Sequence, residues 1–202
     1  MLATRQSLRA DGYYDQTLGV HLVSVIAGQY NWTTADDIAF STTLGSCLSV
    51  CVCDTHAKIG GMNHFLLPEA PENDNSAYSA SFRYGSAAIE GLLNALYSKG
   101  AAKNGLTIKI FGGGRVLNGI SSDVGQRNIE FARRFFTREN LRITSEDVGE
   151  NFGRRIIFFP STGKVLLRKL GEQKELISIA EQEKKIISKL NPQSEEGDVE
   201  LF

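Results

Sequence analysis

The sequence predicts a layered domain of the α/β or α+β class, in which helices pack on sheets. Its 202 residues, 42% of them hydrophobic, are enough for one domain with a buried core. Short apolar runs rich in β-branched residues alternate with two stretches of helical periodicity. The resulting order is strands, helix, strand, helix, strands, and this order is typical of a layered domain.

The first third of the chain predicts a tail and three strands. Residues 1–18 are polar and lack periodicity, so we expect a flexible tail. The run VHLVSVIAGQY (20–30) predicts a first strand. IAFSTTLGSCLSVCVCD (38–54) predicts a second strand that is interrupted at 44–46, and AKIGGMNHFLLP (57–68) predicts a third. The polar stretch PEAPENDNS then predicts a surface loop.

The middle of the chain predicts two helices around a buried strand. Between residues 82 and 99, apolar side chains recur every three or four positions, and Gly100 is suited to end a helix. LTIKIF (106–111) predicts a buried strand. The residues Ser-Ser-Asp at 121–123 can cap a second helix, which has the sequence VGQRNIEFARRFFTREN.

The last part of the chain predicts a hairpin, a charged helix and a tail. RRIIFFPSTGKVLLRKL (154–170) predicts a β-hairpin that turns at 160–163. GEQKELISIAEQEKKIISKL (171–190) predicts an amphipathic helix, which we expect to dock on its own domain rather than to bind a partner. Residues 191–202 are polar and predict a flexible tail, so the main folded domain is expected to span 19–170.

Charge and hydropathy argue against several classes of function. The formal net charge is −1, which does not favour binding to nucleic acid or to an anionic membrane surface. No run approaches the ~18 apolar residues of a membrane span, and the N-terminus lacks the apolar run of a secretory signal. We therefore expect a cytoplasmic protein with reduced thiols that binds no nucleic acid and inserts into no membrane.

All three cysteines lie within one segment of seven residues. An odd number of cysteines argues against a disulfide framework, and the spacing C-x3-C-x-C differs from that of zinc sites. On a continuous strand the three would share a face, and we interpret Cys51 and Cys53 as buried core residues. Cys47 follows Gly45 and Ser46 at the start of the run, where a thiol is expected to be accessible and backbone amides can lower its pKa.

His64 is the candidate partner of Cys47. The two residues lie on successive predicted strands with a short connection, and such strands usually neighbour one another. A thiol within reach of an imidazole is the minimum for an activated cysteine nucleophile. A third group must fix the imidazole, and the candidate hydroxyls are those of Ser41, Thr42 and Thr43. Spacing alone leaves the choice among them open.

The glycine run at 112–114 is a second candidate feature. Neither G-x-G-x-x-G nor the phosphate-binding motif G-x-x-x-x-G-K-[ST] is present there. We therefore interpret the run as a close backbone approach beside the active site, or as a turn. The sequence predicts no metal site and no organic cofactor.

A series of motifs covers most of the predicted domain, from about residue 20 to 170. They are TLGSC, GGMNHFLLP, YGSAAIEGLLNAL, IFGGG, GQRNIEFARRFF, EDVG and GRRIIFFPSTGKVLLRK. In this order they resemble the chemoreceptor glutamine deamidase CheD family. The resemblance implies a three-layered α/β/α sandwich with a mixed sheet, similar to cytotoxic necrotizing factor-type deamidases. Glu150 stands where the family commonly has a second glycine after Gly149, so the resemblance leaves the conformation of this turn open.

The resemblance also implies an activity and a set of site residues. The family hydrolyses glutamine side chains of methyl-accepting chemotaxis receptors to glutamate and ammonia. It implies Cys47 as the nucleophile, which forms a thioester, and His64 as the base. The third member is a threonine six residues before the cysteine, and here that position is Ser41. The backbone amide of Cys47 is the expected oxyanion donor.

The implied partners are the cytoplasmic helical region of these receptors and a CheC-type phosphatase. Two other functions stay open on the sequence alone. One is a different thiol amidohydrolase, and the other is a non-enzymatic chemotaxis adaptor in which Cys47 is structural.

Overall fold

The structure is a computed structural model that describes residues 8, 11–68, 84–116 and 123–190. Within these residues, ten strands form two five-stranded sheets. The first sheet has, in spatial order, β1 (Gly12–Asp15), β2 (Val20–Ser24), β4 (Ile38–Leu44), β9 (Gly153–Phe159) and β10 (Lys164–Leu170). The second has β3 (Gln29–Thr33), β6 (Ile59–His64), β5 (Leu48–Asp54), β7 (Leu106–Gly112) and β8 (Ile143–Val148). The helices are α2 (Gly85–Ser98), the short η1 (Lys103–Gly105), α3 (Val124–Arg138) and α4 (Gln173–Leu190).

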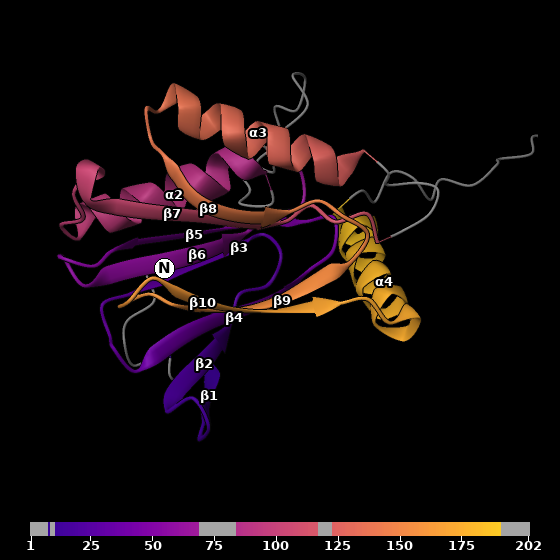
Figure 1. Ribbon diagram of the computed structural model, residues 1–202, viewed down its shortest axis with the longest axis horizontal. Helices are drawn as coiled ribbons and strands as arrows, with labels where there is room; N and C mark the ends of the chain where they lie inside the picture. The colour runs from indigo at the N-terminus through magenta and orange to yellow at the C-terminus, as the bar shows by residue number, and fades with distance from the viewer. Residues whose placement is uncertain (1–7, 9–10, 69–83, 117–122, 191–202) are drawn as a thin grey trace, which may run out of the picture.

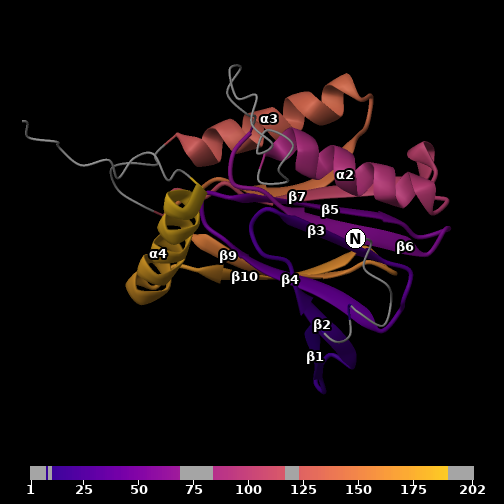
Figure 2. The ribbon, with the colours of Figure 1, turned by 180° about the vertical axis from the view of Figure 1, so that it is seen from behind.

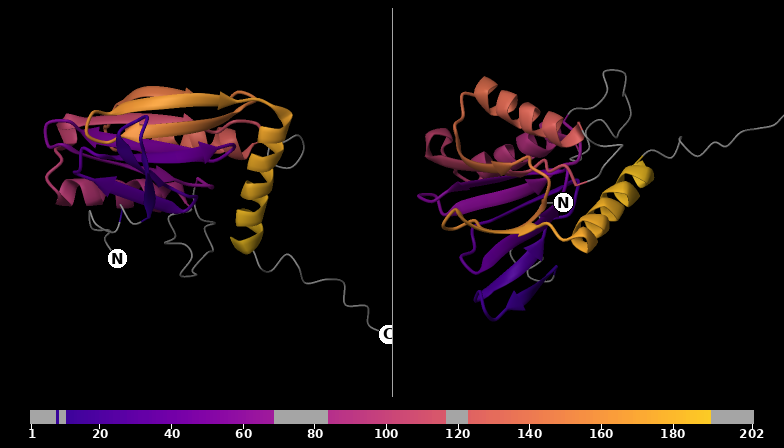
Figure 3. Two further views of the ribbon diagram at one scale, coloured as in Figure 1. Left: turned by 90° about the horizontal axis from the view of Figure 1, so that it is seen from below. Right: turned by 45° about the vertical axis from the view of Figure 1, so that its right-hand side comes forward.

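The two sheets stack face to face, and α2 and α3 lie on the outer face of the second sheet (Figures 1 and 2). Helix α4 does not join that layer but stands across one end of the sheets (Figure 3). Each sheet is mixed, because β2 pairs with β4 and β7 pairs with β8 in parallel, whereas the other pairs are antiparallel.

The alternation of β5 places its side chains in two separate cores. Leu48, Val50 and Val52 point toward α2 and α3 and pack in the core that those helices cover. The three cysteines point the other way, into the core between the two sheets, where Phe40, Leu44, Met62 and Phe158 also lie. The predicted division of this strand into a cysteine face and an apolar face is therefore confirmed.

The predicted α/β class with a mixed sheet is confirmed, and the structure also gives the order of the layers. The layers run helices, sheet, sheet, so the position that a second layer of helices would take in an α/β/α sandwich is occupied by the first sheet (Figure 1). Apolar residues on both faces of β4 account for this arrangement. Phe40 packs toward the second sheet, and Ala39 packs in a separate cluster with Val20 and Leu22.

Two details of the predicted strands differ from the structure. The single strand expected at 20–30 is two strands in different sheets, and the break contains Gly28 with a φ of 83°. Residues 12–15, expected in a flexible tail, form β1, which pairs with β2. The alternating apolar signal is missing there because β1 is an edge strand, on which Tyr13 and Tyr14 are exposed.

The other predicted elements form near their expected positions. The second predicted strand is interrupted at 45–47, and the hairpin of β9 and β10 turns around Gly163, whose φ is 71°. The helix expected at 171–190 forms as α4. Most of the loop predicted after residue 68, the candidate caps Ser121 and Ser122, and the tail at 191–202 lie outside the described residues. None of the helices in the described part of the chain combines the length and apolar character needed to cross a membrane.

Candidate active site

Cys47 lies in the short connection between β4 and β5, where the chain crosses from the first sheet to the second. The glycine run after β7 fixes this connection. The backbone N–H of Gly113 donates to the carbonyl oxygen of Cys47 at 2.8 Å, and that of Gly114 donates to Gly45 at 2.7 Å. A Cβ atom at Gly112, whose φ is 112°, would collide with the same carbonyl oxygen of Cys47. The interpretation of this run as a close backbone approach beside the site is therefore confirmed.

Helix α3 also helps to fix the connection that contains Cys47, through hydrogen bonds from Asn128. The side-chain amide of Asn128 is fully buried and donates hydrogen bonds to the carbonyl oxygens of Ser46 at 3.1 Å and Leu66 at 2.9 Å. It thereby ties the residue before Cys47 to the residue two positions after His64. Sequence reasoning missed Asn128, since an asparagine within a helix carries no local sign of such a contact.

The pairing of β5 with the end of β6 brings Cys47 and His64 together. Leu48 and Phe65 exchange two backbone hydrogen bonds of 3.0 and 2.9 Å. Cys47 and His64 each precede one member of this antiparallel pair, so they are diagonal neighbours on the same face. Diagonal neighbours have Cα atoms about 7–8 Å apart, which long side chains can span. The expected juxtaposition of thiol and imidazole on neighbouring strands agrees with this geometry.

His64 has one ring nitrogen occupied and one free. Its Nδ1 lies 2.8 Å from Oγ1 of Thr42 and 3.4 Å from the carbonyl oxygen of Val25, whereas its buried Nε2 has no hydrogen-bond partner. A carbonyl oxygen only accepts, so this network assigns the proton to Nδ1 and leaves the lone pair on Nε2. A free lone pair on the face shared with Cys47 is what a general base requires.

The hydroxyl that contacts His64 belongs to Thr42, which corrects the expectation of Ser41. Adjacent residues of a strand point to opposite faces. Phe40 and Leu44, which alternate in step with Thr42, point toward the second sheet, whereas Ala39, in step with Ser41, points away from it. Ser41 forms part of the wall of a nearby hollow, but its side chain is on the wrong face of β4 to orient the imidazole.

The pKa of His64 is lowered from 6.5 to about 4, because burial disfavours the imidazolium and the carbonyl of Val25 offsets only part of that effect. The unfolded chain therefore takes up a proton below pH 6.5, whereas the folded chain stays neutral down to about pH 4. We expect the free energy of unfolding to fall as the pH falls through this window, by about 3 kcal/mol in total. Urea titrations across the window measure it. The His64→Gln variant should lose this part of the pH dependence, and an identical profile in that variant would contradict the assignment.

Cys47 is buried, which differs from the accessible thiol that the sequence predicts. Its exposed fraction is 2%, and its pKa is raised well above the ordinary value. Burial is the main cause, followed by the negative charge of Glu183 and a hydrogen bond to it, while the backbone amide acts in the opposite direction. The sequence-based expectation was wrong because the sequence does not show where the predicted helix at 171–190 docks, and α4 carries Glu183 onto the connection before β5.

Glu183 makes two hydrogen bonds at the site. Its Oε1 accepts the backbone N–H of Cys47 at 3.2 Å, and its Oε2 accepts the hydroxyl of Ser46 at 2.7 Å. Some 136 residues separate Glu183 from Cys47 in sequence. No local motif marks it, and only the fold reveals that this carboxylate reaches the candidate nucleophile.

A hollow of about 240 Å³ opens beside His64. Its lining includes Val25, Ile26, Thr42, Arg155 and the exposed Gln182 of α4. The imidazole thus borders this hollow, while the side chain of Cys47 is buried in the core between the sheets.

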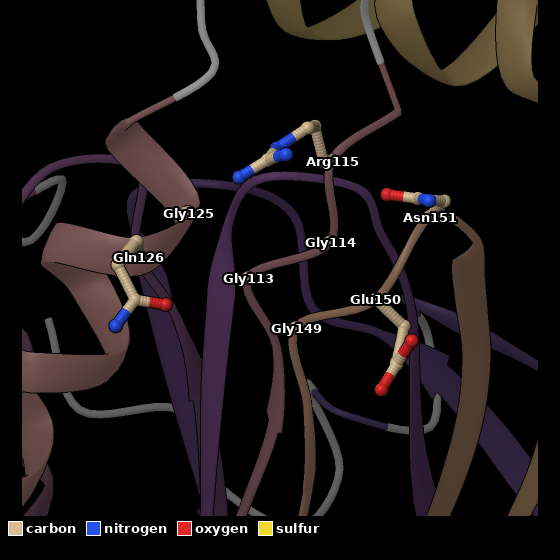
Figure 4. Close-up of a pocket in the computed structure, with 8 residues that line it drawn as sticks. All are labelled: Gly113, Gly114, Arg115, Gly125, Gln126, Gly149, Glu150 and Asn151. Carbon is tan, nitrogen blue, oxygen red and sulfur yellow. The ribbon is translucent and has the colours of Figure 1, made fainter.

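A second hollow, also of about 240 Å³, lies around the glycine run (Figure 4). The side chain of Arg115 extends over it toward the start of α3, and Gln126, Glu150 and Asn151 complete the polar rim (Figure 4). Glu150 has a φ of 63°, and its carbonyl oxygen accepts the N–H of Arg115 at 2.7 Å. The turn thus keeps the left-handed conformation that favours glycine, even with glutamate in this position.

The other two cysteines behave as core residues. Cys51 and Cys53 lie between the sheets, and burial raises the pKa of both thiols. All three thiols are free. Among the described residues, no group of His, Cys, Asp and Glu side chains is arranged to hold a metal ion.

Comparisons with known proteins agree with the motifs. A family model described as CheD chemotactic sensory transduction matches residues 66–169. A probable chemoreceptor glutamine deamidase CheD of Janthinobacterium sp. (strain Marseille) is 41% identical over 200 residues, which are 98% of each chain. Its counterpart in Methylobacillus flagellatus is 40% identical over 98% of this chain and 97% of its own. That of Ralstonia pickettii is 46% identical over 80% of this chain and 68% of its own. The chain therefore belongs to the CheD family.

Proposed function

We propose that this chain hydrolyses the side-chain amide of glutamine residues in chemoreceptors, giving glutamate and ammonia. The names of its relatives support the substrate class. The observation that carries the proposal is the buried, unpartnered Nε2 of His64, on the same face as Cys47 and opposite the nitrogen that Thr42 contacts. In this proposal Cys47 is the nucleophile, His64 is the base and Thr42 orients the base, which are the three roles that thiol catalysis needs.

The proposed first half-reaction forms a thioester. Nε2 of His64 takes the proton of the Cys47 thiol, and the sulfur attacks the carboxamide carbon of the substrate. The oxyanion that results accepts the backbone N–H of Cys47, the donor that Glu183 contacts in this structure. The tetrahedral intermediate collapses, and the imidazolium gives its proton to the nitrogen that leaves as ammonia.

The second half-reaction releases the product. Neutral His64 takes a proton from a water molecule, and the hydroxide attacks the thioester carbon. The carbon–sulfur bond breaks, the thiolate regains a proton from the imidazolium, and a glutamate side chain is left on the substrate. The cycle consumes one water per glutamine, and the residues named supply each proton transfer.

The predicted partners are the cytoplasmic helices of chemoreceptors. A helix presents its glutamine side chains on the surface, where the amide can extend into a narrow site. A CheC-type phosphatase remains a predicted second partner.

Deamidation can be measured directly on purified cytoplasmic fragments of receptors. We expect mass spectrometry to find glutamines converted to glutamate, with uptake of heavy oxygen from labelled water and release of ammonia. The assay uses the full chain together with the Glu183→Ala variant, which frees the amide of Cys47. Conversion of unrelated amides alone would favour another thiol amidohydrolase. Binding to receptors without conversion by either protein would favour an adaptor and refute the proposal.

A further inference from the structure

The carboxylate of Glu183 lies where the proposed reaction would leave its product. It accepts the backbone N–H of Cys47, which is the proposed oxyanion donor, and the hydroxyl of Ser46. The negative charge of the same carboxylate also raises the pKa of the Cys47 thiol, so the two groups lie near each other. One carboxyl group therefore bonds to the oxyanion donor and lies beside the nucleophile. A glutamate formed on a bound substrate would make these contacts.

The surface beside Cys47 is shaped to receive a helix at close range. Ile179 of α4 is buried against two glycines, Gly45 before the nucleophile and Gly153 at the start of β9. A Cβ atom at Gly45 would lie 2.7 Å from Cγ2 of Ile179, and one at Gly153 would lie 2.5 Å from its Cδ1. Any larger residue at these positions would push α4 outward. Gly45, the glycine of the LGSC motif, thus leaves room for a helix to pack against the surface beside Cys47.

Among the side chains of α4 that the structure describes, the buried ones are Ile179, Ala180 and Glu183, and Leu176 packs beside them. Glu175 of the same helix also accepts a hydrogen bond from Arg168 of β10 at 2.7 Å. Ile177 on another face is 51% exposed. The helix stands apart from α2 and α3, at the end of the sheets (Figures 1 and 3). The described apolar side chains of α4 form a cluster separate from the two main cores, so the helix can detach while those cores stay intact.

We propose that α4 is an intramolecular occupant of the substrate site. It seats Glu183 in the position of the product carboxylate, covers Cys47, and must leave before a substrate helix can enter. That Glu183 of α4 occupies the backbone N–H of Cys47 follows from the contacts alone. That a receptor helix takes its place rests on the proposed function.

Alkylation of Cys47 tests the block without any receptor. The full-length protein is treated with iodoacetamide, and labelling of each cysteine is followed by mass spectrometry of its peptides. Glu183→Ala removes the carboxylate, and Ile179→Ser removes the apolar contact with Gly45 and Gly153 but keeps the carboxylate. We expect both variants to be labelled at Cys47 about tenfold faster than the native protein. Labelling at Cys51 reports unfolding and should stay slow in all of them.

Glu181→Ala is the matched control, because Glu181 carries the same charge on the same helix but is exposed. This variant should be labelled at the native rate. Equal labelling of Cys47 in the native protein and in both test variants would overturn the proposal. So would acceleration by Glu183→Ala alone, since that result would show an effect of charge without departure of the helix.

Glu183→Gln tests whether the carboxylate stands in for the product. This substitution places a carboxamide against Cys47, and we expect the variant to convert that carboxamide back to a carboxylate, consuming water and releasing ammonia. The conversion should be absent when Cys47→Ala is added. A carboxamide that persists at position 183 would refute the product-like placement.

Receptor assays on the same variants separate the two proposals. Faster labelling of Cys47 together with faster receptor deamidation supports both. Faster labelling with no deamidation of any receptor by any variant supports the block by α4 and refutes the proposed function. Deamidation by the native protein with labelling unchanged in the variants supports the function and refutes the block.

Discussion

Cys47→Ala is expected to abolish receptor deamidation, with a loss of at least about a thousandfold in kcat, since no other group can form the thioester. The substitution removes one buried sulfur atom and leaves the backbone N–H of residue 47 in place. We therefore expect the thermal midpoint to change little and binding to receptor fragments to persist. Ammonia release and mass spectrometry of the receptor measure the loss.

Cys51→Ala is the control for this experiment. Cys51 is fully buried on the face of β5 that Cys47 shares, but it is paired with Met62 inside the sheet, whereas Cys47 lies in the connection beside Glu183. Replacement of Cys51 should leave kcat within about threefold of the native value, with a small loss of stability from the cavity. If Cys47→Ala and Cys51→Ala were equally active, the nucleophile would have to be another group and the proposed mechanism would fail.

The placement of Cys47 and His64 beside neighbouring strands could be predicted because it depends on local features. A short connection between two strands implies that they are neighbours, and the cysteine run alternates with apolar residues that need a core on the other face. The register observed between Leu48 and Phe65 agrees with that reasoning. The identity of the hydroxyl on His64 could not be predicted in this way. Neighbouring residues of β4 face opposite sides, and which side meets β6 depends on how two sheets stack.

The contacts that complete the site come from distant parts of the chain. Asn128 is 82 residues from Ser46, and Glu183 is 137 residues from it. A buried asparagine and a glutamate on an amphipathic helix look like surface residues in the sequence, because their burial depends on tertiary packing. The expected state of Cys47 was wrong for the same reason, since the docking position of the predicted helix at 171–190 is not visible in the sequence, and the thiol is buried rather than accessible.

The fold, like the site, could be predicted from the sequence only where the signals are local. Helix α2 and the hairpin of β9 and β10 were predictable because periodicity and turn residues are local signals. The assignment of strands to two sheets was not. The chain leaves the first sheet at 25–28, and it crosses again at 45–47. Each crossing resembles a short irregularity within one strand when only the sequence is read.

Thr42→Val is expected to lower kcat by about 10- to 100-fold, the equivalent of one hydrogen bond that orients the base. Valine keeps the shape of threonine but cannot contact Nδ1 of His64 at 2.8 Å as the hydroxyl does. The imidazole would then keep only the longer hydrogen bond to the carbonyl of Val25, so Nε2 would be less well directed toward Cys47. Because the hydroxyl touches the base rather than the substrate, KM should change little. Steady-state kinetics on a receptor fragment separates the two parameters.

Ser41 and Thr42 offer a discriminating pair, since they are adjacent on one strand and both are buried hydroxyl residues. Thr42→Ser should restore most of the activity, because serine supplies the same donor and acceptor, whereas a residue that only fills space would not be rescued in this way. Ser41→Ala should stay near the native rate, because residue 41 lies on the face of β4 turned away from His64. A loss caused by Ser41→Ala but not by Thr42→Val would show that β4 takes the opposite face in the active enzyme. The orienting role would then belong to Ser41.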